Sequence, residues 1–289
     1  MAISFVQNAS NMIKAREIVT SFGGKQMLIA KIEKFDAVQN IDAILEASDG
    51  LMVARGDLGI EVAYYEVPSI QKMLIHKANM ASKPVITATQ MLLSMTYSQR
   101  ATRAEISDIA NAVLDGTDAV MLSEESAVGK YPVLAVKAMF ETIRETELHY
   151  NYFQFDDIKC LDATNAIEES AVRISRDLSV DGILSVTSSG NSARKLSKYR
   201  PKQPIYAVTH DDGVRQQLTL SWGIVPTFSV KKTSFEKTVH NVMQRGIKDE
   251  VLNTQGSYIL SAGNTGGVSG STNTIRLFAK AEMKFFDKP

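Results

Sequence analysis

The sequence predicts an α/β protein in which helices cover a parallel sheet. Short apolar, β-type runs alternate with helical stretches along the whole chain, which is the pattern of parallel strands joined by helices. Polar side chains also collect just after several of these runs, as they do at the carboxyl ends of parallel strands. The chain has 289 residues, enough for one large or two medium domains.

Five strands are expected in the first half of the chain, with helical stretches between them. They cover 2–6, 27–32, 50–54, 84–88 and 118–122. The clearest helix covers 102–114, where apolar residues recur at the period of one helix face and Asp115-Gly116 provides the stop. A further amphipathic helix is expected at 132–148, because Pro132 suits an early helical position.

Polar residues follow every predicted strand from the second onward. They are Lys31 and Glu33, Arg55 and Asp57, Thr89 and Gln90, and Ser123 and Glu125. Such clustering is typical of a (β/α)8 barrel or of an open doubly wound sheet. A barrel needs eight strands, and the sequence offers about five βα units. Either the sheet is open, or three strands lie upstream of Met1. Because the first strand begins at once, we expect truncation and a partial (β/α)8 TIM barrel.

A separate three-layer α/β domain is expected in the second half. Residues 1–150 form the first domain, 151–163 lose periodicity and are interpreted as a linker, and 164–289 restart the alternation. The helices of this second domain are expected at 164–178, 190–198, 212–221 and 233–248. Its strands are expected at 182–186, 204–208, 224–229, 257–261 and 274–280.

The composition is that of an ordinary globular protein with balanced charge. Lys plus Arg and Asp plus Glu both number 32, so no basic excess points to nucleic acid and no charge run points to a membrane surface. No apolar run reaches the roughly 18 residues of a membrane span, and the N-terminus lacks the pattern of a secretory signal, so a cytoplasmic location is expected. Cys160 is the only cysteine, which excludes an intrachain disulfide and fits a reducing compartment.

Lys31 and Glu33 stand two residues apart on a predicted strand, so their side chains share one face. A lysine supplies a compact positive charge for phosphate, and a carboxylate supplies a hard oxygen ligand for Mg²⁺. The pair therefore predicts a site for phosphate and a divalent metal. An exposed ion pair at the end of a strand is the alternative interpretation.

Two further groups follow the next strands. Residues 54–59 contain two glycines, which let backbone N–H groups approach an anion, and Asp57, which offers a second metal carboxylate. An ordinary tight turn explains the same residues. The hydroxyl of Thr89 suits phosphate binding or proton delivery, and a hydrogen bond to nearby backbone is its alternative role.

Two segments of the second domain are candidates for phosphate binding. Residues 186–192 run from a strand into a helix, where hydroxyls and free N–H groups cradle a phosphate. Residues 262–273 are rich in Gly, Ser and Thr and form either a loop that closes on the same ligand or a flexible turn. None of the four histidines pairs with cysteine at metal-ligand spacing, so no zinc site is expected.

Taken together, these segments resemble the pyruvate kinase family over nearly all of the chain. The motifs that carry the resemblance are 30–33, 44–61, 83–91, 102–105 with 108–116, and 121–126. The resemblance implies transfer of the phosphoryl group of phosphoenolpyruvate to ADP, giving pyruvate and ATP. The chain departs from the family at Ala101, where proline is usual, and at 123–126, where Ser-Glu-Glu-Ser replaces Ser-Gly-Glu-Thr.

The resemblance implies a role for each matched residue. Lys31 stabilises charge on the phosphoryl group and on the enolate, Glu33 and Asp57 hold Mg²⁺ (or Mn²⁺), and Thr89 lies near the protonation step. The implied substrate-binding residues are Ala54, Arg55, Gly56, Asp57 and Thr89, with the N–H groups of Gly56 and Asp57 on the substrate carboxylate. K⁺ is expected for the family, but its ligands belong to the segment that precedes the match to Met1.

The second domain resembles the family's effector domain. Its phosphate-binding loop matches Thr187, Ser188, Ser189, Gly190, Asn191 and Ser192, and a looser match to the effector loop gives Gly267, Ser269 and Gly270. Residues 262–270 lack the basic and aromatic residues of enzymes tuned to fructose 1,6-bisphosphate. The implied effector is a sugar monophosphate or AMP, or there is none.

The family's first three barrel strands and its lid domain have no counterpart here, so we expect negligible activity from this chain alone. The unpaired edges of a five-strand sheet predict a homo-oligomer, and the intact family is usually tetrameric. One alternative is a non-catalytic regulatory protein that binds phosphometabolites. Another is an aldolase-like barrel with a Schiff base on Lys31, which is disfavoured because Glu33 keeps Lys31 charged.

Overall fold

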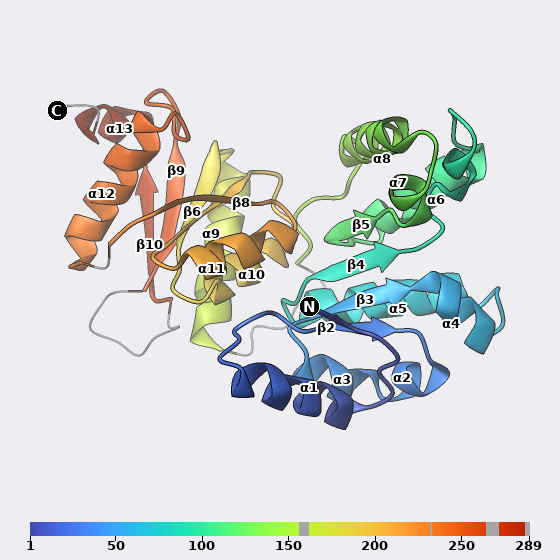
Figure 1. Ribbon diagram of the computed structural model, residues 1–289. Helices are drawn as coiled ribbons and strands as arrows, with labels where there is room; N and C mark the ends of the chain where they lie inside the picture. Colours follow the sequence, from blue (N-terminus) through green and yellow to red (C-terminus); the bar gives the residue numbers. More distant parts are fainter. Residues whose placement is uncertain (156–161, 232, 264–271, 287–289) are drawn as a thin grey trace. The chain divides into compact units, whose positions relative to one another are not determined.

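The computed structural model describes residues 1–155, 162–231, 233–263 and 272–286. The chain divides into two compact units, Met1–Asn151 and Tyr152–Pro289, and each is described by itself (Figure 1). Each unit has one sheet with helices packed on it, so the predicted α/β class is confirmed. Cys160 and part of the expected linker lie outside the described residues.

The sheet of the first unit contains five parallel strands in chain order. They are β1 Ala2–Ile3, β2 Ile29–Ile32, β3 Gly50–Ala54, β4 Val85–Ala88 and β5 Ala119–Met121. Within the described residues, β1 and β5 each pair with one neighbour, so the sheet is open and does not close into a barrel. The first strand is shorter than predicted, because Phe5 has a φ of 55°, which takes the chain out of the extended conformation.

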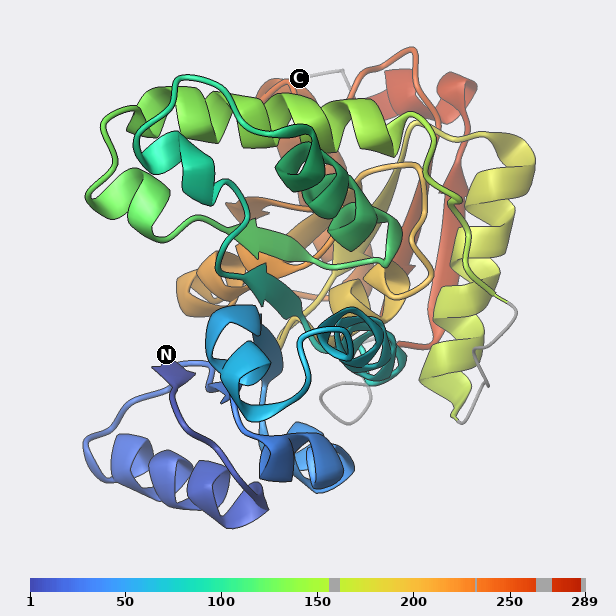
Figure 2. The same cartoon turned by 90° about the vertical axis from the view of Figure 1, so that its right-hand side faces the viewer.

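The helices of the first unit follow the strands in turn. They are α1 Ala9–Ser21, α2 Phe35–Gln39, α3 Ile41–Ala47, α4 Arg55–Glu61, α5 Val67–Met80, α6 Arg103–Leu114, α7 Glu124–Ala127 and α8 Pro132–Glu147, with a 3₁₀ turn η1 at Leu93–Thr96. The predicted helices at 102–114 and 132–148 are confirmed as α6 and α8. Helices α6, α7 and α8 pack together beside η1, as Figure 2 shows in green.

One face of this sheet carries the main core. Ala30 and Ile32 of β2 face α1, α3 and α5, where Met12, Ile44 and Leu74 are fully buried. Because strand residues alternate between faces, Ile29 and Lys31 point to the other face. That face has a smaller apolar cluster with Met52 and Ala88. The alternation therefore puts Lys31 on the side of the sheet away from this helical core.

The second unit has a five-stranded sheet in the order β10-β9-β6-β7-β8. The strands are β6 Gly182–Val186, β7 Ile205–Thr209, β8 Ile224–Ser229, β9 Tyr258–Ala262 and β10 Thr274–Phe278, and only β10 runs antiparallel to its neighbour. The helices are α9 Ala163–Leu178, α10 Asn191–Ser197, α11 Asp212–Gln217, α12 Phe235–Lys248 and α13 Lys280–Phe286, with a 3₁₀ turn η2 at Leu218–Leu220.

Apolar clusters lie on both faces of this sheet, which gives the predicted three layers (Figure 1). Helices α9 and α10 cover one face, and α12 and α13 cover the other. The predicted strand at 274–280 is wrong at its end, because the chain leaves β10 at Phe278 and continues as α13. The predicted helix at 212–221 is α11 followed by η2. Across the described residues, no helix is long and apolar enough to span a bilayer.

Candidate functional site

Lys31 and Glu33 are in contact at the carboxyl end of β2. Lys31 Nζ forms an ion pair with Glu33 Oε1 and donates a hydrogen bond of 2.9 Å to Ser4 Oγ. The other carboxylate oxygen, Glu33 Oε2, accepts a hydrogen bond of 2.6 Å from the N–H of Phe5. Glu33 is 1% exposed, and the Lys31 side chain is 24% exposed. A buried carboxylate therefore holds a partly accessible ammonium at the carboxyl end of the sheet.

Residues with strained backbone conformations also lie at the carboxyl end of the sheet. Phe5 follows β1 with a φ of 55°, and Thr89 and Gln90 follow β4 with φ values of 70° and 55°. A positive φ is costly for a β-branched residue such as Thr89, and strained residues of this kind persist at functional sites. This end of the sheet is where the sequence places the predicted catalytic groups.

The Thr89 hydroxyl joins two of the loops at this end of the sheet. Its Oγ1 accepts a hydrogen bond of 2.8 Å from the N–H of Gly56 and donates one of 2.6 Å to the carbonyl of Ala88. Gly56 lies in the first turn of α4, so residues 55–61 form a helix where a tight turn was the alternative. The N–H of Gly56 is thus held by Thr89, while the neighbouring N–H of Asp57 is one of the first-turn amides that a helix leaves without an intrahelical acceptor.

The side chain of Arg55 holds the loop that contains Thr89 in place. Its Nη2 donates to the carbonyl of Thr89 at 2.8 Å, and its Nη1 donates to Asp108 Oδ1 at 2.7 Å. The side chain is 10% exposed. The guanidinium is therefore held by protein acceptors on two other elements. Asp108 lies within a motif of the sequence resemblance, but its partner was not predictable from spacing alone.

Asp57 and Glu33 approach the same cation, Lys34. A hydrogen bond from Lys34 Nζ to Glu61 Oε1, 2.6 Å long, raises the pKa of Lys34, and the charges of Asp57 and Glu33 act in the same direction. Asp57 itself is exposed. Both carboxylates thus lie within electrostatic reach of one ammonium, at the same end of the sheet. Sequence reasoning did not single out Lys34, because it follows the strand as an ordinary surface lysine.

The residues fit a divalent metal only as part of its coordination. The described residues contain no group of three or more His, Cys, Asp or Glu side chains arranged for a metal. They do supply two carboxylates, and apart from the Lys31 ammonium no donor in the described chain reaches the buried Glu33 Oε1. Carboxylates of this kind are the ligands that Mg²⁺ takes in pairs, with waters and substrate oxygens completing the shell.

Glu125 is a buried acid that links two loops of the first unit by hydrogen bonds. It is 1% exposed, and its two oxygens accept backbone hydrogen bonds of 2.9 Å from Leu92 and 2.8 Å from Ser123. The carboxylate therefore ties η1 to the start of α7. Glu124, the additional acid of the 123–126 segment, is exposed.

In the second unit, the loop after β6 is closed by its own residues. Thr187 Oγ1 accepts a hydrogen bond of 3.0 Å from the N–H of Gly190, whose φ is 82°. A Cβ at Gly190 would lie 2.9 Å from Leu218, so the turn needs glycine twice over. Ser188, Ser189 and Asn191 are exposed along this loop. The predicted effector residues Gly267, Ser269 and Gly270 lie outside the described residues.

A buried acid behind this loop was not found from the sequence. Burial raises the pKa of Glu168 on α9 to about 7. Its Oε2 accepts a hydrogen bond of 2.6 Å from Ser261, and a pair of hydroxyls, Ser192 and Thr272, lies close by at 2.5 Å from each other. A glutamate in an amphipathic helix is usually on the solvent side, so no sequence signal marked it.

Comparison with known proteins matches both units. The family model described as pyruvate kinase, barrel domain, matches residues 1–136, and that described as pyruvate kinase, alpha/beta domain, matches residues 165–278. A pyruvate kinase of Clostridium acetobutylicum is 41% identical over 96% of this chain and 60% of its own length. One of Bacillus licheniformis is 41% identical over 98% of this chain and 49% of its own length.

A third relative, a pyruvate kinase of Lactobacillus delbrueckii subsp. bulgaricus, is 43% identical over 95% of this chain and 48% of its own length. The chain thus spans about half to three-fifths of the curated relatives it matches. The two domain models match in the order expected for the two units and leave only short segments unmatched. The chain therefore belongs to the pyruvate kinase family of transferases.

Proposed function

We propose that this chain carries the phosphoenolpyruvate and divalent-metal side of a pyruvate kinase, which transfers a phosphoryl group to ADP and yields pyruvate and ATP. The observation that supports this most is the contact of Lys31 with Glu33, with Asp57 at the same end of the sheet. Phosphoryl transfer needs positioning and charge neutralisation more than covalent chemistry. A partly exposed ammonium paired with Glu33, with a second carboxylate at the same end of the sheet, supplies both.

Each residue then has one task. The Lys31 ammonium neutralises charge on the phosphoryl group and on the enolate, and Ser4 and Glu33 hold it in place. Glu33 and Asp57 would hold Mg²⁺ (or Mn²⁺), which supplies Lewis-acid charge at the phosphate oxygens when bound. The N–H of Asp57 would bind the substrate carboxylate, and that of Gly56 would do so once Thr89 releases it. Thr89 would lie near the protonation of the enolate.

This half of the site can be tested by binding. Phosphoenolpyruvate titrated calorimetrically into the chain in the presence of Mn²⁺ should bind, and Lys31→Met should weaken the affinity about tenfold or more, because a charge-assisted contact is lost. Lys14→Met is the matched control, since Lys14 is exposed on α1. Equal affinities for Lys31→Met and the unaltered chain would contradict the assignment.

We also propose that the 289-residue chain alone has negligible turnover. The sheet described here supplies five strands, and the resemblance puts the K⁺ ligands and the nucleotide arginines in strands that precede the matched segment. A coupled assay with phosphoenolpyruvate, ADP, Mg²⁺ and K⁺ should therefore give a rate far below that of the Clostridium acetobutylicum relative assayed in parallel. Near-normal turnover by the pure chain would overturn this proposal.

A second candidate function, a non-catalytic protein that binds phosphometabolites, is favoured by the second unit. The Thr187–Gly190 turn presents Ser188, Ser189 and Asn191 to solvent. Glucose 6-phosphate and AMP, titrated separately, should then bind, and Ser189→Ala should weaken binding. Effector binding with no binding of phosphoenolpyruvate would favour this second function over the first.

A further inference from the structure

A pocket of about 760 Å³ opens in the second unit between α12, β10 and α13. None of its lining residues belongs to the loop at 187–192. One of the three elements that line it, α13, lies beyond residue 278, where the family model for this domain stops matching. Pockets of this size bind small molecules when an apolar wall is combined with a few polar groups.

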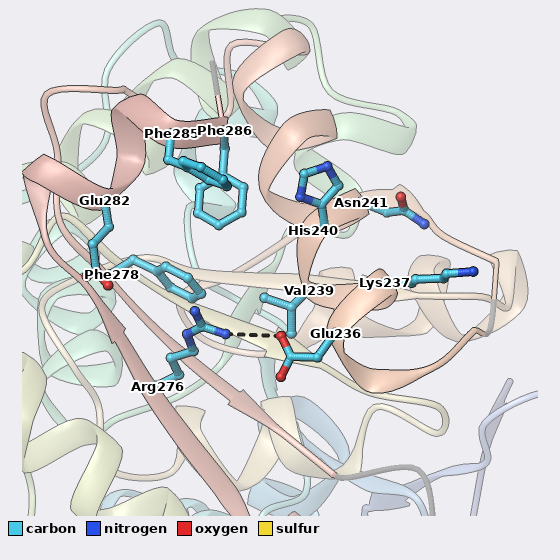
Figure 3. A pocket seen from close by; sticks show the side chains of 10 residues that line it. All are labelled: Glu236, Lys237, Val239, His240, Asn241, Arg276, Phe278, Glu282, Phe285 and Phe286. Atoms are coloured by element: carbon cyan, nitrogen blue, oxygen red, sulfur yellow. Dashed lines mark hydrogen bonds and ion pairs between the residues drawn. The ribbon is translucent and has the colours of Figure 1, made fainter. Parts of the chain in front are cut away.

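The apolar wall consists mainly of phenylalanine rings from β10 and α13 (Figure 3). Phe286 of α13 lies 5.7 Å from Phe278 of β10, with their planes at 77°. The ring of His240 on α12 is also 5.7 Å from Phe286, and Phe285, which is 68% exposed, meets Phe286 edge-on. Phe286 is thus the centre of an aromatic wall that a flat ring can stack on.

A guanidinium stands against this wall. Arg276 lies 4.8 Å from the ring centre of Phe278, and Figure 3 shows its link to Glu236 across the pocket. That ion pair is 3.4 Å long, which is longer than the 2.7–2.9 Å of a strong charge-assisted pair. Glu236 is 77% exposed, so it can turn away at little cost. Arg276 is therefore available to another anion.

Besides the Arg276–Glu236 pair, the pocket is lined by one carboxylate and one ammonium, whose charges balance each other. Glu282 Oε2 accepts a hydrogen bond of 2.9 Å from the N–H of Ala279, so this carboxylate serves to start α13. Lys237 lines the pocket from α12, and no partner for its ammonium is found within the described residues. The pocket thus combines stacking surface, one loosely held guanidinium and one further cation.

We propose that this pocket binds a small flat aromatic anion, with its ring against Phe286 and its anionic group on Arg276 in place of Glu236. The chemical class is an aromatic ring that carries a carboxylate, sulfonate or phosphate. The proposal is independent of the phosphoryl-transfer site of the first unit, because all residues that it uses lie in the second unit.

The test is calorimetric titration of the full chain with 2-naphthoate and with its neutral counterpart, 2-naphthylmethanol. The naphthoate should bind about tenfold more tightly than the alcohol, because only the carboxylate can pair with Arg276. Arg276→Gln should remove this difference. Glu236→Gln should strengthen naphthoate binding severalfold, because the competing carboxylate is lost. Lys248→Gln, an exposed change of charge at the end of the same helix, should change neither affinity.

Phe286→Leu keeps an apolar side chain but removes the ring, so it should weaken both ligands equally. Circular dichroism of each variant would confirm that the second unit remains folded. Glu236→Gln keeps the test decisive even if Arg276→Gln unfolds, since Glu236 is exposed. No naphthoate binding at millimolar concentration would overturn the proposal. Equal binding of acid and alcohol, or no effect of Glu236→Gln, would show an adventitious apolar surface and would overturn it as well.

Discussion

Three glutamate side chains are almost fully buried in the described part of the chain, and each has different partners. Glu33 has an ammonium and a backbone N–H, and Glu125 has two backbone N–H groups. Glu168 has neutral hydroxyls only: that of Ser261 donates to its Oε2, those of Ser192 and Thr272 lie close by, and within the described residues no donor makes a direct hydrogen bond to its Oε1. Because a buried ionised carboxylate needs compensation on both oxygens, Glu168 is the residue of the three whose protonation should govern stability.

The stability of the second unit should therefore fall as the pH rises from about 4.5 to about 7. Burial raises the pKa of Glu168 from 4.5 to about 7, so the folded chain binds the proton more tightly than the unfolded chain does. Stability from this group is complete below the unfolded pKa and is lost as pH rises through the folded pKa, by up to about 3 kcal/mol. The measurement is urea unfolding at pH 5 and at pH 8, followed by the fluorescence of Trp222, the only tryptophan, which gives the free energy of unfolding at each pH.

Glu168→Gln separates this effect from the rest of the titration. The amide stays neutral, so the difference in unfolding free energy between pH 5 and pH 8 should shrink by most of that amount. Glu236→Gln, at an exposed site of the same unit, should leave the difference unchanged. If the Glu168→Gln variant keeps the full difference in unfolding free energy between pH 5 and pH 8, the pH dependence comes from other groups.

Arg55 should stabilise the first unit through geometry as well as charge. Its fork reaches both the carbonyl of Thr89 and Asp108, and a lysine cannot reproduce both bonds. Arg55→Lys should lower the free energy of unfolding by about 2 to 3 kcal/mol. It should also weaken phosphoenolpyruvate binding, because Thr89 loses its support. Arg100→Lys, at an exposed position, is the control for calorimetric unfolding and should show neither effect.

At the scale of elements, prediction succeeded where local signals and tertiary packing agree. The helix at 102–114 has apolar residues on one face and a capping box, and the structure contains it as α6. Helix α13 was missed because its start depends on Glu282 reaching back to Ala279 and on burial of Met283 against the sheet. Periodicity along a seven-residue segment does not reveal either contact.

In the candidate site, too, the sequence predicted contacts within one strand but not contacts between elements. Lys31 and Glu33 were predicted to share a face because strand spacing dictates it, and they are in contact. The partners of Arg55 and Thr89 come from other strands and helices, so spacing along the chain carried no signal for them. Residues that act across elements need the sheet register, which brings Ala54 opposite Ala88.

The cap of α6 gives a test at this scale. Thr102 Oγ1 accepts a hydrogen bond of 3.2 Å from the N–H of Glu105, and Glu105 Oε2 accepts one of 2.8 Å from the N–H of Thr102. Thr102→Ala should lower the free energy of unfolding of the first unit by about 1 kcal/mol. Thr146→Ala, in the last turn of α8, should be neutral or slightly stabilising because alanine has the higher helix propensity. Equal effects of both changes would mean that the cap contributes nothing.

At the scale of the whole molecule, the two edges of the first sheet decide how the chain behaves in solution. Within the described residues β1 and β5 pair on one side each, so their outer N–H and C=O groups are open to another strand. Open edges without charged or proline residues favour pairing with a second chain, and β5 reads Ala-Val-Met. We therefore predict that the purified chain forms homo-oligomers.

Size-exclusion chromatography with multi-angle light scattering should give a mass that is a multiple of the chain's own and that falls on dilution. Met121→Lys should shift the distribution to smaller species, because a lysine on an edge strand opposes strand addition. Ser126→Lys adds the same charge at an exposed position of α7, outside the edge, and should not. A clean monomer at every concentration would mean that the edges are blocked, and equal effects of the two lysines would assign the association to net charge and not to the edge.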